Sequence, residues 1–460
     1  MHYLIKNGRI ITKENDFFGD ILIANGKIAA IDKIIHLDDS AIEIINAQQK
    51  YVIPGGVDAH VHLHLPTPAG FSSDDFYTGS IAALYGGTTS FIDFVTPNKN
   101  ESLIAALKKR IKEAENAVCD YSFHVGVTSW SEHTKSEMEQ CVKEYGITSF
   151  KTYMAYTGTI GIDEYELEKI MKIAAKLKVF VTVHCELGNE ILKRQQAFIQ
   201  HNKTSPLYHA LSRTEEVEFE SVRQVIALAK KTGCNTYIVH TSTAESLEII
   251  EKAQKDGYTV FSETCPQYLL LDVNNYEKPV PESLKYVISP PLRKEKDRAR
   301  LWQGLKEDII SVVATDHCPF NTNAQKDVGI NDFTKIPNGA GGIEERMSLL
   351  YTYGVLSGKI SLQQWVALSS TNPAHIFGLS PQKGEIAVGA DADVVIWNPL
   401  SENIISKNTH HQHCDSNIYE NFKIKGKAEY VFLRGIPIIT KNNLIESSIE
   451  NGNFLMRKMK

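Results

Sequence analysis

The 460-residue sequence lacks a strongly basic segment and a long apolar run at its start. Its 49 basic and 55 acidic residues give a net charge of −6, so nucleic acid and anionic membranes are poor candidate partners. The first 31 residues alternate apolar and polar side chains around Asn-Gly turns. This pattern is typical of β-hairpins and differs from the apolar core of a secretory signal.

The sequence also lacks any Cys-x-x-Cys pair. Its seven cysteines are scattered and odd in number, which favours a reducing compartment over a disulfide framework or a structural zinc knuckle. We therefore expect a soluble, cytoplasmic protein.

From residue 52 onward the sequence repeats a pattern of apolar strand, loop and helix. The segments between the strands are rich in Ala, Leu, Lys and Glu and have helical periodicity. The eight candidate strands are residues 52–58, 89–94, 121–127, 147–152, 179–183, 236–239, 258–262 and 311–314. Eight successive strand–helix units predict an α/β fold, a (β/α)₈ TIM barrel, whose chemistry takes place at the carboxyl ends of the strands.

Both ends of the chain differ from this repeat. Residues 383–399 and 430–438 are turn-rich and strand-like, as the first 50 residues are. We expect a small β-sandwich domain formed by both chain ends, from residues 1–52 and 381–445, beside a barrel domain of residues 53–380. Residues 446–460 would be a C-terminal tail, frayed over 456–460.

Metal-ligand residue types end four of the predicted strands. His60 and His62 are two positions apart and so lie on one face of the first strand. His184 and His240 end the fifth and sixth strands, and Asp316 follows the eighth. A lone histidine there is more often satisfied by hydrogen bonds at the rim, but packing would not select ligand types at every end. The set predicts a metal site, which suits a borderline metal such as zinc.

Lys151 ends the fourth strand and does not fit a cationic site. An ammonium group facing a dication would be repelled, so Lys151 either points away or becomes anionic. Burial and nearby cations lower the pKa of a lysine and expose its neutral amine. Such an amine can take up carbon dioxide to form a carbamate, whose oxygens can bridge two metals roughly 3.5–4 Å apart. The alternative, a solvent-facing lysine, is disfavoured by the small and apolar neighbours.

With these motifs in place, the chain resembles the cyclic amidases of the amidohydrolase superfamily, a group that contains dihydropyrimidinase and D-hydantoinase. The matching segments cover nearly the whole chain. They include GGVDAHVH at 55–62, GGTT at 86–89, FKTYMAY at 150–156, SETCPQY at 262–268, SPPLR at 289–293, ATDHCP at 314–319 and PNG at 337–339.

The resemblance implies a pair of divalent metal ions, expected to be zinc. His60, His62 and Asp316 would bind one ion, His184 and His240 the other, and carboxylated Lys151 would lie between them. A bridging hydroxide would be the nucleophile. The resemblance also implies a homotetramer.

It further implies roles for four residues in the reaction. Asp316 would accept the proton of the nucleophile and return it to the leaving amide nitrogen. Tyr156 would donate its hydroxyl to the tetrahedral oxyanion. Backbone groups of Ser289 and Asn338 would hold the imide or ureide edge of the ring. The expected reaction is hydrolysis of dihydropyrimidines or 5-substituted hydantoins to N-carbamoyl amino acids.

The segment LHLPTP at 63–68 departs from the family, which usually has an acidic residue here. This loop borders the variable group of the substrate in relatives, so it leaves the preferred substrate open. Allantoinase remains an alternative. Dihydroorotase ranks lower, because an arginine expected at position 64 is His64. A non-catalytic family scaffold is disfavoured, because all six ligand positions are filled.

Two further features have less direct interpretations. The cluster His410, His411, His413 and Cys414 is interpreted as a structural loop in preference to an extra metal site. Asp58 shares the face of His60, which makes it a candidate to support that ligand.

Overall fold

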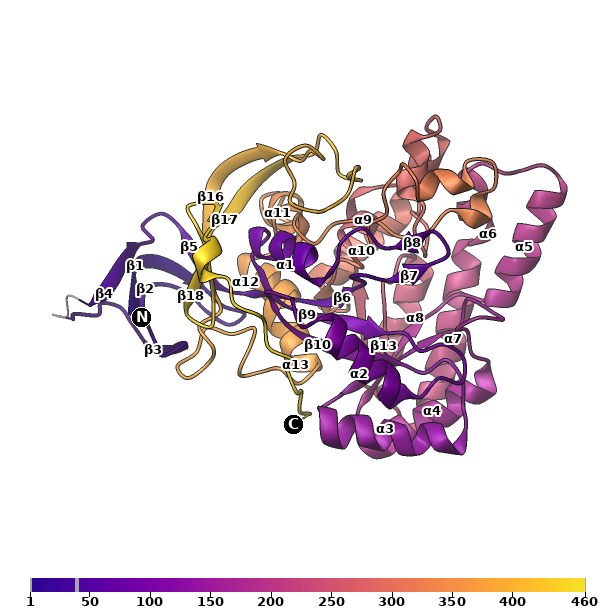
Figure 1. The fold of residues 1–460 in the computed structure, drawn as a ribbon, viewed down its shortest axis with the longest axis horizontal. Coiled ribbons are helices and arrows are strands. Elements are labelled where there is room, and N and C mark those ends of the chain that lie inside the picture. Colours follow the sequence, from indigo (N-terminus) through magenta and orange to yellow (C-terminus); the bar gives the residue numbers. More distant parts are fainter. Residues whose placement is uncertain (1, 38–40, 460) are drawn as a thin grey trace.

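The computed structural model describes residues 2–37 and 41–459. Within these ranges it contains a parallel eight-stranded barrel sheet and a separate nine-stranded mixed sheet made from both ends of the chain (Figure 1). The predicted fold class, a (β/α)₈ barrel beside a β-structure from the chain ends, is confirmed. Among the helices of the described ranges, none has both the length and the apolar composition for crossing a membrane.

The barrel strands follow one another in chain order around the sheet. They are β6 (Gly56–Val61), β9 (Thr88–Val95), β10 (Asp120–Gly126), β11 (Ser149–Tyr153), β12 (Phe180–His184), β13 (Thr236–Ile238), β14 (Val260–Thr264) and β15 (Val312–Val313). The ends of the sheet meet where the amide of Asp316 donates to the carbonyl of His60 (2.9 Å) and the amide of His62 to the carbonyl of His317 (2.8 Å). The last strand therefore brings its following segment directly against the first.

The predicted strand at 52–58 is divided between the two sheets at Gly55. The part before it, β5 (Tyr51–Pro54), pairs with strands of the mixed sheet, whereas β6 after it belongs to the barrel. Consecutive amides bond to different partners, since Gly55 donates to Asp393 (2.8 Å) and Gly56 to Gly87 (2.8 Å). A Cβ at Gly55 would lie 2.2 Å from Oγ1 of Thr89, so the crossing requires glycine.

Helices lie around the barrel (Figure 1), and the last of them packs buried residues into its interior. They are α1 (Phe76–Tyr85), α2 (Leu103–Glu113), α3 (Glu132–Tyr145), α4 (Glu164–Leu177), α5 (Gly188–Gln200), α6 (Leu207–Ser212), α7 (Glu215–Thr232), α8 (Ala244–Lys255), α9 (Pro266–Leu270), α10 (Glu295–Lys306), α11 (Arg346–Leu350), α12 (Leu362–Val366) and α13 (Asn372–Ile376). A two-stranded hairpin of β7 (Pro66–Thr67) and β8 (Gly70–Phe71) follows β6.

Helix α4 illustrates why these segments form. Asp163 caps its start in a reciprocal pair with Glu166, and Lys178 ends it in the left-handed conformation. Leu167, Ile170 and Ala174 are buried at helical spacing, so one face packs against the barrel. Complete burial of a leucine or isoleucine side chain stabilises the fold by about 1.5–3 kcal/mol.

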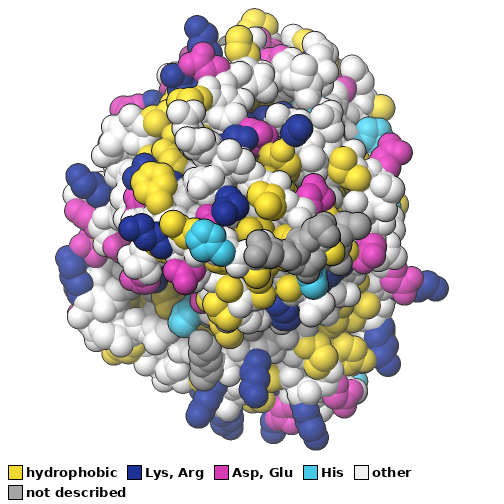
Figure 2. All heavy atoms as spheres, turned by 90° about the vertical axis from the view of Figure 1, so that its left-hand side faces the viewer, with side chains coloured by type: hydrophobic (Ala, Val, Ile, Leu, Met, Phe, Trp, Pro, Cys, Tyr) yellow, Lys and Arg dark blue, Asp and Glu magenta, His cyan; other side chains and the backbone are white. Residues whose placement is uncertain are grey.

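The mixed sheet is formed by both chain ends. Its strands are β1 (His2–Ile11), β2 (Asp16–Ala24), β3 (Lys27–Asp32), β4 (Ile42–Asn46), β5, β16 (Val394–Ile404), β17 (Lys423–Leu433), β18 (Ile436–Thr440) and β19 (Asn443–Leu444). A cluster of buried residues from β1, β2, β16 and β17 forms its own core. Figure 2 shows this end of the molecule, where charged side chains of both signs are mixed with separate apolar groups.

The interior of the barrel is packed with apolar side chains. Phe377, which follows α13, is fully buried, and its ring centroid lies 4.9 Å from that of Tyr237 and 6.1 Å from that of Phe180. Val57 and Ile92 belong to the same cluster. The interior is thus a packed core, and an open cavity forms at the carboxyl ends of the strands.

The prediction of a frayed tail is wrong for the described residues near the end. Arg457 is 3% exposed, and its guanidinium donates to Oγ of Ser149 (3.0 Å) and to the carbonyl of Phe123. The amide of Leu455 donates to the carbonyl of Tyr121 (2.7 Å). The tail is ordered because it supplies donors and an apolar side chain to a buried surface of the barrel.

Candidate metal centre and active site

A cavity of about 860 Å³ opens at the carboxyl ends of the barrel strands. All nine residues predicted to form the site line it: His60, His62, Lys151, Tyr156, His184, His240, Ser289, Asn338 and Asp316. The fold therefore gathers the residues from the strand ends and those implied by the resemblance around one cavity, whose volume is within the range of small-molecule sites.

Asp316 lies against both histidines of the first strand. Its Oδ1 is 3.1 Å from Nε2 of His60 and 3.2 Å from Nε2 of His62, and the two nitrogens are 3.1 Å apart. The ligand atoms of His60, His240 and Asp316 all lie within 4.8 Å of one another. Imidazole nitrogens and a carboxylate oxygen converging in this way fit a divalent metal ion.

His184 and His240 extend the cluster on its other side. Their ring centroids are 4.6 Å apart, and that of His240 is 5.4 Å from that of His60. Burial, and then the charge of Lys151, hold the pKa of His184 well below its ordinary value. Burial and then His184 do the same to the pKa of His240. Both rings are therefore neutral at pH 7 and have a nitrogen lone pair for a metal.

Two buried glutamates fix the orientation of two of these rings. Nε2 of His184 donates to Oε2 of Glu186 (2.7 Å), and Nδ1 of His60 contacts Oε1 of Glu263. The hydroxyl of Tyr237 donates to the other oxygen of Glu263 (2.8 Å). These bonds leave Nδ1 of His184 and Nε2 of His60 for a metal, the arrangement typical of metal-bound histidines.

The sequence analysis missed both glutamates. Glu186 is two residues after His184, so the alternation of an extended segment was a usable signal. Asp58, predicted to support His60, accepts a hydrogen bond from the amide of His60 (3.3 Å) and two from Thr315, at the amide (3.2 Å) and at Oγ1 (2.7 Å). It supports the backbone beside Asp316.

Lys151 is buried at 1% exposure. Its Nζ lies 4.9 Å from the ring centroid of Phe94 and 5.2 Å from that of Tyr153. Burial lowers its pKa to about 8, against the opposing effect of Glu263 and Asp316. Among the described residues, no salt bridge within 4.0 Å joins this amine to a carboxylate, and with a pKa of about 8 it loses its proton more readily than an exposed lysine does.

Three of the site residues adopt left-handed backbone conformations that are rare outside glycine. The φ angles are 58° at Tyr156, 36° at His240 and 53° at Asp316. Such conformations persist when the surroundings over-determine them, and they cluster at functional sites.

The aromatic ring of Tyr156 lies 5.2 Å from that of His184, and burial raises the pKa of its hydroxyl to about 12. Tyr156 therefore keeps its proton at pH 7.

Ser289 and Asn338 belong to two segments that are joined directly. The amide of Gly339 donates to the carbonyl of Val287 (3.0 Å). Nζ of buried Lys326 donates to that same carbonyl (2.9 Å) and to the carbonyl of Pro337 (3.0 Å). This side of the cavity therefore has a fixed backbone spacing.

The outer part of the cavity is mostly apolar. Leu65, Pro66, Pro68, Ile160 and Ile336 lie on it, so the divergent loop forms part of the wall. His64 lies outside the lining, with its ring stacked on Phe71 at 4.0 Å.

The histidine-rich segment forms ordinary loop contacts. His410 contacts the carbonyl of Cys414 (3.0 Å), and Nδ1 of His411 contacts Oε1 of Glu344 (2.8 Å). In the described part of the chain, the group of His60, His240 and Asp316 is the one cluster with metal-ligand geometry.

The fold and this cluster define a class: (β/α)₈ barrel enzymes with a metal centre at the strand ends. A family model described as "Amidohydrolase family" matches residues 51–436. The chain belongs to this family, whose members are metal-dependent.

Full-length relatives identify the branch of the family. The chain is 43% identical over 446 residues to the D-hydantoinase of Geobacillus stearothermophilus, covering 97% of this chain and 94% of that one. It is 37% identical over 457 residues to the dihydropyrimidinase of Dictyostelium discoideum, covering 99% and 90%. The crystal structure of dihydropyrimidinase from Brevibacillus agri has a TM-score of 0.97 at 40% identity, covering 99% of each chain. The resemblance to the cyclic amidases is thus confirmed.

Proposed function

We propose that this chain is a binuclear metal-dependent cyclic amidase that opens dihydropyrimidines or 5-substituted hydantoins to N-carbamoyl amino acids. The observation that carries the proposal is the convergence of His60, His184, His240 and Asp316, with the buried amine of Lys151, in one cavity. Full-length identity to hydantoinases and dihydropyrimidinases supports the same reaction.

The donor set fits two divalent ions. His60, His62 and Asp316 would hold one ion, and His184 and His240 the other, with the carbamate of Lys151 between them. The neutral imidazoles of His184 and His240 favour zinc, and the depressed pKa of Lys151 favours uptake of carbon dioxide by its free amine. Burial opposes a positive charge on His60, yet Glu263 and Asp316 raise its pKa to about 9, so His60 would release a proton when it binds a metal. When bound, the metals lower the pKa of water and polarise the substrate carbonyl.

Asp316 would act as general base and then general acid. Its carboxylate accepts the proton of the attacking water while the oxygen bonds to the ring carbonyl carbon. When the carbon–nitrogen bond breaks, Asp316 returns that proton to the leaving nitrogen, so water is added across the amide.

Tyr156 and two backbone segments would orient the substrate. The Tyr156 hydroxyl remains protonated because burial raises its pKa to about 12, so it can donate a hydrogen bond to the developing oxyanion. The backbone at Ser289 and Asn338 would pair with the imide or ureide edge of the ring.

The cavity wall also supports a ranking of substrates. Its outer part is mostly apolar, and Lys335, a cation on the described lining besides Lys151, pairs with Asp332 (3.3 Å). Allantoin, with a polar substituent, ranks second. Dihydroorotate ranks last because its carboxylate would lack a dedicated buried cation.

We also place the protein in the cytoplasm, where its seven free thiols would stay reduced, and expect a homotetramer. The test of the function is a panel of dihydrouracil, hydantoin, phenylhydantoin, allantoin and dihydroorotate on metal-loaded enzyme. We expect ring opening of the first three. Preference for allantoin, or no turnover at full metal loading, would overturn the proposal.

A further inference from the structure

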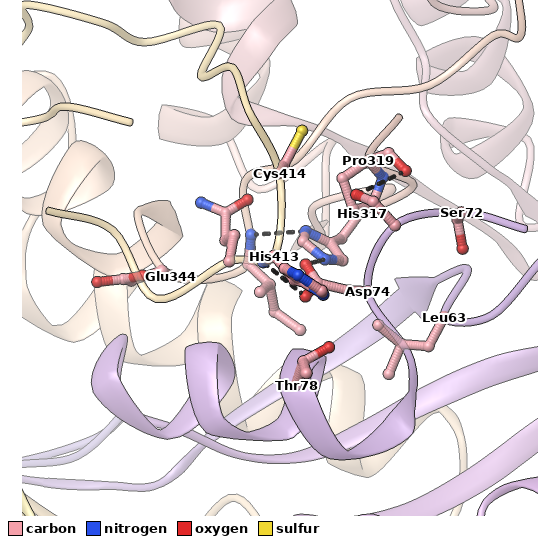
Figure 3. A network of polar contacts seen from close by, with 12 residues as sticks. Leu63, Ser72, Asp74, Thr78, His317, Pro319, Glu344, His413 and Cys414 are labelled. Carbon is pink, nitrogen blue, oxygen red and sulfur yellow. Dashed lines mark hydrogen bonds and ion pairs between the residues drawn. The ribbon is translucent and has the colours of Figure 1, made fainter. Parts of the chain in front are cut away.

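A fully buried pair of ionisable side chains lies directly behind Asp316. Oδ2 of Asp74 is 3.0 Å from Nε2 of His317, and both side chains are completely buried. Asp74 immediately precedes the N-cap of α1, whereas His317 follows Asp316. Figure 3 shows the carboxylate of Asp74 beside the ring of His317.

The ring of His317 is fixed on both sides. Its Nδ1 accepts hydrogen bonds from the amides of Gly342 (3.1 Å) and Ile343 (3.3 Å). Because Nδ1 is an acceptor, the ring hydrogen is on Nε2, which donates to Asp74. Rotation of the ring would break three hydrogen bonds between buried groups, and each broken bond would leave a buried polar group unsatisfied.

The backbone around His317 connects this ring to the proposed metal ligands. The carbonyl of His317 accepts from the amide of His62 (2.8 Å), and the amide of Asp316 donates to His60 (2.9 Å). Asp316 itself has a φ of 53°, a conformation that needs support from its neighbours. Fixing the ring at position 317 therefore restricts the backbone on which the Asp316 carboxylate is carried.

The histidine-rich segment, residues 410–414, holds the carboxylate of Asp74 in place. The amide of His413 donates to Oδ1 of Asp74 (2.8 Å), so both carboxylate oxygens of Asp74 are used (Figure 3). The segment is itself held at His411, whose amide donates to Oε2 of Glu344 (2.6 Å). A loop remote in sequence thus orients the carboxylate that orients His317.

We propose that Asp74 and His317 are positioning residues for the proposed ring-opening reaction, and that they hold Asp316 in its left-handed, reactive orientation. The inference rests on the proposed function, because it assigns the pair to the proton transfers of Asp316. Neither residue is on the described lining of the cavity. The pair acts through the backbone, so its loss should lower kcat more than it changes KM or the metal content.

The test is Asp74→Asn in the full-length, metal-loaded protein. The new amide has one oxygen for two donors and turns its NH₂ toward the other donor, while the side-chain volume is kept. We expect kcat to fall by on the order of 10- to 100-fold, because small misplacement of a catalytic group has effects of this size. Metal content should match that of the wild type, and KM should stay within about threefold.

Glu344→Gln is the matched control. It removes a carboxylate from the other attachment of the same segment and leaves the Asp74–His317 pair in place. We expect a lower melting temperature and a kcat that falls far less than in Asp74→Asn, because the amide of His413 keeps its bond to Asp74. A fall in kcat as large as that of Asp74→Asn would assign the effect to general loosening of the segment and overturn the proposal.

Three measurements separate loss of the positioning role from misfolding of the variant and from failure of the proposed function. A folded Asp74→Asn protein that keeps kcat within about twofold, or loses it only in proportion to lost metal, would overturn the proposal. If the wild type opens no substrate of the panel, the proposed function fails. A crystal structure of metal-loaded Asp74→Asn then decides: a changed φ at Asp316 supports the positioning role, and an unchanged φ overturns it.

Discussion

Nε2 of His184 and Oε2 of Glu186 form a 2.7 Å hydrogen bond inside a fully buried pocket. Arg213 contacts the same glutamate oxygen from its other side. The carboxylate thereby fixes the ring of His184 and keeps its other nitrogen free. Glu186 is thus the outer partner of a proposed metal ligand.

Substitution Glu186→Gln should weaken metal binding. The amide oxygen of a glutamine can take the position of Oε2 and keep both contacts, but it is neutral, so it accepts more weakly from His184 and no longer balances the charge of Arg213. We expect metal affinity to fall by about 10–100-fold, measured by competition with a chelator. Glu190→Gln, at a partly exposed position of the neighbouring helix where the carboxylate pairs with Arg194 (2.8 Å), is the control. Equal affinity in both variants would show that Glu186 does not support the ligand.

Lys151→Ala should lose metal and activity together. The variant has no amine for a carbamate, and the two ions lose their shared ligand. Added short carboxylates should restore part of the activity by occupying the space left by the side chain. Metal analysis with and without acetate measures this. Retained activity at full metal loading would show that Lys151 is not part of the metal centre.

Tyr156→Phe should lower kcat by about 10²–10³, the effect of losing one oxyanion donor. Metal content should be unchanged, because the hydroxyl is not a proposed ligand. Tyr276→Phe removes another buried hydroxyl, one that accepts from the amide of Leu292 (3.0 Å) away from the cavity, and serves as control. Equal kcat for Tyr156→Phe and wild type would exclude the oxyanion role.

Lys326 should make stability depend on pH. Burial lowers its pKa to about 7 in the native protein. Between about pH 7 and the ordinary pKa of lysine, the unfolded chain therefore binds more protons than the native protein does. Stability therefore rises with pH in this window, by up to about 1.4 kcal/mol per pH unit. Compared with Lys326→Met, the wild type should gain in melting temperature from about pH 7 to about pH 9. A constant difference would contradict this.

The sequence predicted the parts of the site that obey a local rule. Ligand types at strand ends identified His60, His184 and Asp316, because parallel strands of a barrel end at one rim. Lys151 stood out as a cation among metal-ligand types. Their roles as ligands stay predictions for metal analysis to test.

Other features depend on tertiary contacts that no local pattern contains. Asp74 lies outside the barrel strands and meets His317 from a position 243 residues away. The predicted strand at 52–58 has no internal break in hydrophobicity, and only its neighbours show that it changes sheets at Gly55. Arg457 looked like part of a charged, free end, yet its guanidinium is satisfied by buried acceptors.

The change of sheet at Gly55 bears on any attempt to dissect the molecule. Gly55 is five positions before His60, and the amides of Gly55 and Gly56 are bonded to different halves of the structure. Excising the barrel as a minimal enzyme would remove the contacts that hold the start of β6, the strand that leads to His60 and His62. Chimaeras within this family should therefore exchange both terminal segments together with the barrel they accompany.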